Sequence, residues 1–93
     1  MEIIISKVAK QEFEDAQQFY ELQQAGLGLR FKNEIKLALL RIQQFPEAWP
    51  LEREEIHKYL IHKFPYKILY GIQENKILIL AFAHQHRDPF YWI

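Results

Sequence analysis

The sequence predicts an α+β protein with the element order β-α-α-β-β-β, in which an N-terminal helical hairpin packs on one face of a small, mostly antiparallel sheet. Two observations carry this prediction. Apolar residues recur at spacings of three and four as far as Pro46, and beyond it they form β-branched and aromatic runs. The 93 residues are too few for more than one such unit, so residues 1–93 are expected to form a single domain.

The first half of the chain predicts one short strand and two helices. Glu2 to Ser6 begins with a β-branched run, and Ser6 is placed to cap a helix that starts near Val8. Gly26 is expected to end this helix, because glycine enters the left-handed conformation without steric cost. The apolar stripe of this first helix consists of Ala9, Phe13, Ala16 and Tyr20.

A second helix is expected from Gly28 to Phe45. Pro46 stops it, since proline lacks the amide hydrogen that a further turn would need. Two amphipathic helices joined by a few glycine-bearing residues form an antiparallel hairpin. The stripe of the second helix consists of Phe31, Ile35, Ala38, Ile42 and Phe45, widened by Leu39 and Leu40.

After the loop from Pro46 to Pro50 the sequence predicts three strands, Ile56 to Phe64, Tyr66 to Ile72 and Ile77 to Ala83. The turn-forming residues 73–76 separate the last two, so two adjacent hairpins are expected. The third run is apolar at seven consecutive positions. Both of its faces should therefore be covered, which predicts a central strand.

Composition narrows the class of protein. Hydrophobic residues make up 49% of the chain and aromatic residues 15%, which favours a folded domain over a disordered one. The chain has no cysteine, so it forms neither a disulfide framework nor a thiolate metal site, in keeping with a reducing cytoplasm. The longest apolar run is far shorter than the roughly 20 residues that span a bilayer. We expect a cytoplasmic protein without a membrane partner.

Charge is balanced overall but not along the chain. Residues 1–55 carry seven Lys or Arg against ten Asp or Glu, whereas residues 56–93 carry five against two together with all four histidines. A polyanion, if one binds, is expected to contact the C-terminal half. The alternative is a solvated sheet face balanced by acidic helices, and the excess of three charges does not decide between them.

Histidines and tryptophans also mark candidate sites. His84 and His86 lie two apart and could face the same side of a strand, but two histidines without a third ligand make a poor metal site. A hydrogen-bonding role is favoured, and neither a metal nor a cofactor is expected. Trp49 and Trp92 lie in a loop and near the C-terminus, where a small domain rarely buries them fully. They indicate a surface that a partner covers.

Six segments of the chain, taken in order, resemble the RelE/ParE superfamily of type II toxin–antitoxin toxins, and its ParE-like branch in particular. Any one segment alone is weak evidence for this resemblance, but six matching segments in the same order over nearly the whole chain are specific evidence. They are the opening strand, the first helix with its apolar stripe, the turn Gly26-Leu27-Gly28 into Phe31, the stop Phe45-Pro46, the run Phe64-Pro65-Tyr66-Lys67-Ile68-Leu69-Tyr70, and His84 to Trp92.

The resemblance implies a protein that arrests growth when free and is neutralised by a cognate antitoxin, expected to be of the ribbon-helix-helix type. ParE-like members are regarded as non-catalytic poisons of DNA gyrase. RelE-like members are metal-independent endoribonucleases that cleave messenger RNA on the ribosome. In the RelE-like alternative the resemblance assigns catalysis to Arg87, Tyr91 and His84. For either target it assigns antitoxin or target binding to His57, Lys58, His62, Lys63, Arg87, Phe90, Tyr91 and Trp92.

The chain departs from the ParE pattern at His57 and Lys58, where a pair of arginines is expected. Imidazole and ammonium groups cannot form the bidentate fork of a guanidinium, so a phosphate or carboxylate contact there would be weaker. A third alternative is therefore a weakly toxic or inactive member that acts as a binding module. The sequence is compatible with both a homodimer and a toxin–antitoxin hetero-oligomer.

Overall fold

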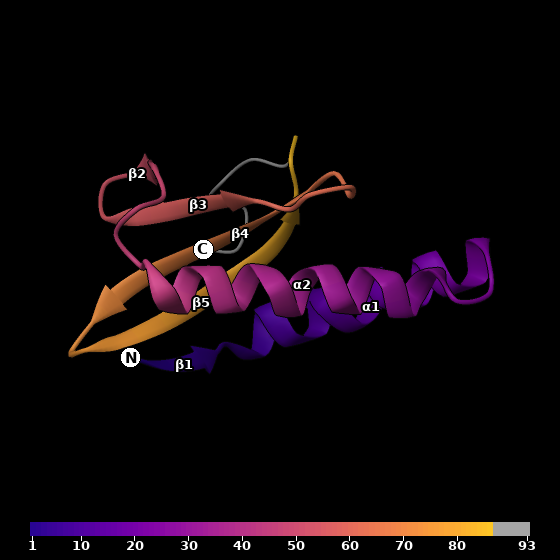
Figure 1. Ribbon diagram of the computed structural model, residues 1–93, viewed down its shortest axis with the longest axis horizontal. Helices are drawn as coiled ribbons and strands as arrows, with labels where there is room; N and C mark the ends of the chain where they lie inside the picture. Colours follow the sequence, from indigo (N-terminus) through magenta and orange to yellow (C-terminus); the bar gives the residue numbers. More distant parts are fainter. Residues whose placement is uncertain (87–93) are drawn as a thin grey trace.

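The protein consists of one five-stranded sheet with two long helices packed against it, as the computed structural model shows for residues 1–86 (Figure 1). The predicted α+β class is confirmed. In chain order the elements are β1 (Glu2–Ile5), α1 (Lys7–Gln23), α2 (Leu27–Gln44), β2 (Leu51–Arg53), β3 (Ile56–Leu60), β4 (Tyr66–Gln73) and β5 (Lys76–His84).

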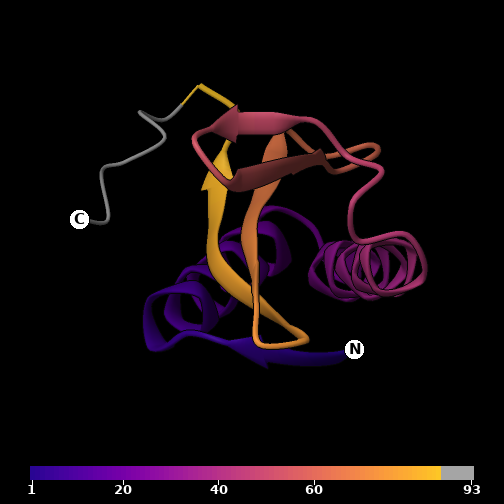
Figure 2. The same cartoon turned by 90° about the vertical axis from the view of Figure 1, so that its left-hand side faces the viewer.

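The strands lie in the order β1-β5-β4-β3-β2. The two predicted hairpins, β3–β4 and β4–β5, are antiparallel, whereas β1 pairs in parallel with β5, so the sheet is mixed. Strand β5 lies between β1 and β4, which confirms that the seven-residue apolar run is a central strand. Figure 2 shows β1 and the β2–β3 pair at opposite ends of the twisted sheet.

Strand β2 was not predicted. It is a three-residue edge strand that pairs with β3 through a shifted register at Leu51 and Arg53. Three residues, two of them charged, are too short to show the alternation of apolar and polar residues that identifies a strand. The strand predicted from Ile56 to Phe64 is also shorter than expected, because it ends at Leu60.

The helix termini confirm one predicted cap and correct another. Ser6 caps α1, since its Oγ accepts a hydrogen bond from the amide of Ala9 at 3.1 Å. Gly26 does not cap α1. The helix ends at Gln23, and Gln24 is its C-cap. Gly26 instead precedes α2 with a φ of 88°. The prediction of a left-handed glycine was right, but its assignment to the first helix was wrong.

Aromatic rings fill the space between the helices and the sheet. Phe31 of α2 has no exposed surface and lies 5.2 Å from Tyr20 of α1 and 5.2 Å from Phe64, measured between ring centroids. The predicted stripe of α2 is buried from Phe31 to Ile42, but Phe45 at its end is exposed. Neither helix in the described part of the chain is both long and apolar enough to cross a bilayer.

Candidate functional site

The two faces of the sheet carry different residues because side chains alternate along each strand. Ile68 and Tyr70 of β4 belong to the core beneath the helices. Lys67 and Leu69 alternate with them and therefore lie on the other face, which we call the distal face. Lys58 of β3 pairs in register with Leu69, so it lies on the distal face as well.

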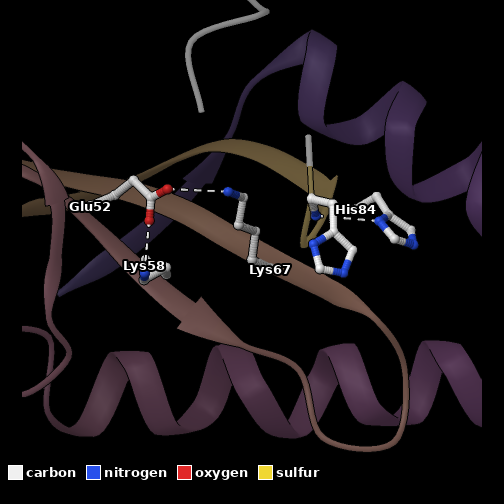
Figure 3. A network of polar contacts seen from close by, with 5 residues as sticks. Glu52, Lys58, Lys67 and His84 are labelled. Carbon is white, nitrogen blue, oxygen red and sulfur yellow. Dashed lines mark hydrogen bonds and ion pairs between the residues drawn. The ribbon is translucent and has the colours of Figure 1, made fainter. Parts of the chain in front are cut away.

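Three charged side chains from three neighbouring strands meet on the distal face (Figure 3). The Nζ of Lys67 lies 3.2 Å from Oε1 of Glu52, and the Nζ of Lys58 lies 3.1 Å from Oε2 of the same carboxylate. Glu52 comes from β2, Lys58 from β3 and Lys67 from β4. We call these three residues the lysine–glutamate cluster. Its formal charge is +1.

Lys67 is the most enclosed member of the lysine–glutamate cluster. It is 3% exposed, and it is the one charged residue that is buried within residues 1–86. Burying an ammonium group is costly unless an anion compensates it, and the Glu52 carboxylate supplies that compensation. Burial by itself would raise the pKa of Glu52, but hydrogen bonds and charge from Lys58 and Lys67 outweigh burial and hold this pKa below its ordinary value.

His57, a predicted binding residue, packs on the helix side of the sheet. Its ring stacks on Tyr70 with centroids 5.0 Å apart, and its Nδ1 lies 2.7 Å from the carbonyl oxygen of Trp49. The indole of Trp49, predicted to be a partner surface, packs edge-on against Tyr59 at 4.7 Å and is partly buried. His57 and Lys58 are adjacent in sequence but point to opposite faces, so they do not form one site.

The remaining predicted residues within the described part lie at two further places. His62 and Lys63 are exposed in the turn between β3 and β4, where Lys63 Nζ lies 4.0 Å from a carboxylate oxygen of Glu34 on α2. His84 ends β5, and its ring contacts Tyr66 and His86 at centroid distances of 5.7 Å and 5.5 Å.

His84 lies apart from the lysine–glutamate cluster. A groove beneath α1 is lined by Glu12, Asp15, Phe19, Tyr66 and His84. The predicted catalytic histidine thus faces the helix side, whereas Lys58 and Lys67 lie on the distal face. Arg87, Phe90, Tyr91 and Trp92 lie outside the described residues. Within residues 1–86, no three histidine, aspartate or glutamate side chains gather where they could hold a metal ion.

Glu52 was not among the predicted site residues. Lys67 was noted only as part of the run from Phe64 to Tyr70, and no role was predicted for it. Glu52 lies within residues 51–55, between the predicted loop and the next predicted strand, so nothing indicated its partners. Lys67 did leave a signal, because it is a lone charge inside the otherwise apolar run from Tyr66 to Tyr70. A charge at a buried strand position requires a counter-charge, and this requirement could have prompted a search for one.

The described residues form a small α+β protein in which two helices pack against a five-stranded sheet. Residues 3–89 match the family model described as ParE toxin of type II toxin-antitoxin system, parDE. The chain therefore belongs to the ParE toxin family of type II toxin–antitoxin systems.

Solved structures agree with the fold. Nine structural chains match this one. One of them, from a structure described as the chromosomal ParDE toxin–antitoxin system from P. aeruginosa, superposes with a TM-score of 0.78 at 16% sequence identity. The match covers 90% of this chain and 95% of that chain. A search of curated proteins finds no match.

Proposed function

We propose that this ParE-family toxin inhibits growth by binding DNA gyrase and that a cognate antitoxin of the ribbon-helix-helix type neutralises it. Family membership supports the toxin and antitoxin roles. The choice of a binding mechanism over a catalytic one rests on one observation. Three of the basic side chains predicted for the target surface, His57, Lys58 and Lys63, have protein partners and do not converge on a common point.

The competing ribonuclease mechanism makes specific demands. Such an enzyme needs cations that stabilise the charged phosphorane and a group that moves protons at the 2′-hydroxyl and the leaving oxygen. Lys58 and Lys67 share the Glu52 carboxylate. His57 packs against Tyr70, and His84 faces the opposite side of the sheet from the two lysines. This arrangement favours a protein-binding surface.

An antitoxin has exposed surface available to it. Strands β1 and β2 are the edges of the sheet, and an added strand from an antitoxin would satisfy backbone groups at such an edge. Several large apolar side chains on the helices are also exposed, among them Phe19 and Leu22. Apolar surface of this kind is typical of an interface.

The test is induced expression of the chain alone, with its antitoxin, and with Arg87→Ala. Growth, the DNA-damage response and cleavage of a reporter message are followed together. The proposal predicts growth arrest with a damage response and intact message, and relief of the arrest by the antitoxin. Message cleavage that is lost in Arg87→Ala would contradict the proposal and support the ribonuclease.

The lysine–glutamate cluster favours a second candidate, a weakly toxic member that acts as a binding module. Glu52 neutralises the lysine that stands where a ParE arginine is expected, so the surface lacks an unpaired guanidinium at that point. Soluble protein that binds the antitoxin but does not arrest growth would support this candidate over the gyrase poison.

A further inference from the structure

An apolar groove lies between the two helices, which pack side by side against one face of the sheet (Figure 2). Phe13 of α1 and Phe82 of β5 lie in it with ring centroids 5.9 Å apart, and Ile35 and Leu39 of α2 form its other side. Ile5, at the end of β1, completes the lining and is 44% exposed. We call this feature the interhelical groove. Among residues 1–86 it presents only apolar surface to solvent.

Three lysines stand along the interhelical groove. Lys10 lies on α1, whereas Lys32 and Lys36 lie on α2. A lysine can bury its aliphatic stem along apolar surface while its ammonium group stays in water. Because the exposed lining is apolar, these lysines contribute their stems to the walls of the groove, and their charges form its rim.

The positive charge of this rim has no counter-charge within residues 1–86. None of the three ion pairs found there involves a rim lysine. Lys32 and Lys36 are four residues apart on α2, so two like charges are neighbours on the helix surface, which is unfavourable. The one acidic residue of α2, Glu34, pairs with Lys63 instead. An anion bound at the rim would relieve this repulsion.

The size of the interhelical groove limits what it can hold. Its volume is about 210 Å³. Pockets that enclose drug-sized ligands begin at roughly 300 Å³, so this groove has room for one unbranched hydrocarbon chain. A partner helix is about 10–12 Å across with its side chains and would rest on the rim without filling the groove. An apolar floor with a cationic rim complements a chain that carries an anionic head.

From these observations we propose that the interhelical groove binds a medium-chain fatty-acid anion. The hydrocarbon chain lies against Phe13 and Leu39, and the carboxylate lies between Lys32 and Lys36. Binding removes apolar surface from water and supplies the charge that the rim lacks. This inference goes beyond the proposed action on gyrase and does not depend on it.

The test is calorimetric titration of the full chain with decanoate, below the concentration at which decanoate forms micelles. Saturable binding of one decanoate per chain is expected. Affinity should rise about three- to fourfold with each added methylene from octanoate to dodecanoate, because each methylene leaves water. Decyltrimethylammonium has the same chain with a cationic head, and it should bind at least about tenfold more weakly because the lysines repel it.

Two variants locate the site on the interhelical groove. Leu39→Gln places a polar group in the lining and should weaken decanoate binding at least about tenfold. Leu40→Gln is the matched control, since it makes the same change at the next residue, which is exposed and does not line the groove. Lys32→Gln combined with Lys36→Gln should weaken the binding of decanoate but not that of uncharged decanol.

Lys7→Gln combined with Lys76→Gln removes the same charge from exposed positions outside the groove and should leave decanoate binding unchanged. Circular dichroism verifies that each variant folds. If Leu39→Gln does not fold, the two lysine double variants still test the proposal, because they differ in the position of the lost charge and not in its amount.

The proposal is overturned if decanoate shows no saturable binding, if decanoate and decyltrimethylammonium bind equally, or if the two lysine double variants bind decanoate alike. Two other occupants would give distinct results. Self-association of the full chain in sedimentation, lost in Leu39→Gln and without decanoate binding, would identify a second copy. Antitoxin affinity lost in Leu39→Gln, again without decanoate binding, would identify the antitoxin. Either result would also overturn the proposal.

Discussion

At the residue scale, Tyr70 shows how a polar group is accommodated in a small core. The residue has no exposed surface, and its hydroxyl donates a hydrogen bond to the carbonyl oxygen of Pro46 at 2.6 Å. Burial raises the pKa of Tyr70 to about 12, so the hydroxyl stays protonated and remains a donor. The bond ties β4 to the loop that follows α2.

Tyr70→Phe is predicted to lower the free energy of unfolding by about 1 kcal/mol, because the Pro46 carbonyl loses its donor while the ring packing is kept. Urea unfolding monitored by fluorescence measures the change. Tyr20→Phe serves as a control, since no hydrogen bond from the Tyr20 hydroxyl is found within residues 1–86, and it should change stability by less than about 0.5 kcal/mol. Equal effects of the two substitutions would contradict this account.

Glu52 makes the stability depend on pH. In the folded protein, Lys58 and Lys67 hold the pKa of Glu52 below its ordinary value of 4.5. The ionised carboxylate therefore stabilises the protein above about pH 4.5, and this stabilisation is lost as the pH falls through the pKa that Glu52 has in the folded state. The difference in unfolding free energy between wild type and Glu52→Gln should therefore be largest near neutral pH and shrink in acid. Urea unfolding between pH 7 and pH 3.5 measures it. A difference that does not depend on pH would show that the charge of Glu52 does not contribute to stability.

At the scale of the elements, the two helices approach each other closely at Gly28. A Cβ at this position would lie 2.8 Å from the carbonyl oxygen of Gln17 in α1, a contact that backbone atoms cannot relieve without moving. The amides of Gly26 and Gly28 each donate a hydrogen bond of 3.0 Å to the carboxylate of Glu21. Glycine and carboxylate together set the approach of α2 to α1.

Gly28→Ala is predicted to destabilise the protein by about 1–3 kcal/mol, because the added methyl group forces the helices apart. Thermal unfolding measures the loss. Gly71→Ala is the control, since a Cβ there would meet nothing within 4 Å and its φ is not in the left-handed region. If the two variants unfold at the same temperature, the close approach of the helices does not limit stability.

The elements also show what the sequence could and could not predict. The two helices and the three longer C-terminal strands followed from apolar periodicity, and the central position of β5 followed from its continuous apolar run. Strand β2 carries no such pattern, so no element was predicted for its residues. The lysine–glutamate cluster escaped prediction for the same reason. Glu52 and Lys67 meet through strand pairing across 15 residues of sequence, which no local pattern records.

At the scale of the whole molecule, folding brings some basic residues of the second half of the chain against acidic residues of the first half. Each of the three ion pairs found within residues 1–86 joins a lysine of the basic C-terminal half to a glutamate of the acidic N-terminal half. Folding therefore neutralises part of the basic surface that the sequence predicted for a polyanion. This cancellation is one reason to favour a protein target over a nucleic acid in the wild-type chain.

Truncation after His86 is predicted to weaken antitoxin binding, because it removes the aromatic residues Phe90, Tyr91 and Trp92, which are expected to contact the partner. Titration of the truncated and full chains with purified antitoxin measures the loss, and circular dichroism of both verifies that the truncated chain still folds. An unchanged affinity would show that the C-terminal aromatic residues do not contribute to the interface.

Inhibition of purified DNA gyrase is the direct test of the proposed mechanism. The full chain is added to a supercoiling reaction with relaxed plasmid, with and without an equimolar amount of antitoxin, and a ribosome-programmed message is incubated with the same preparation. The gyrase mechanism predicts loss of supercoiling, its recovery when the antitoxin is present, and an intact message. Full supercoiling in the presence of folded toxin, together with cleavage of the message, would contradict it.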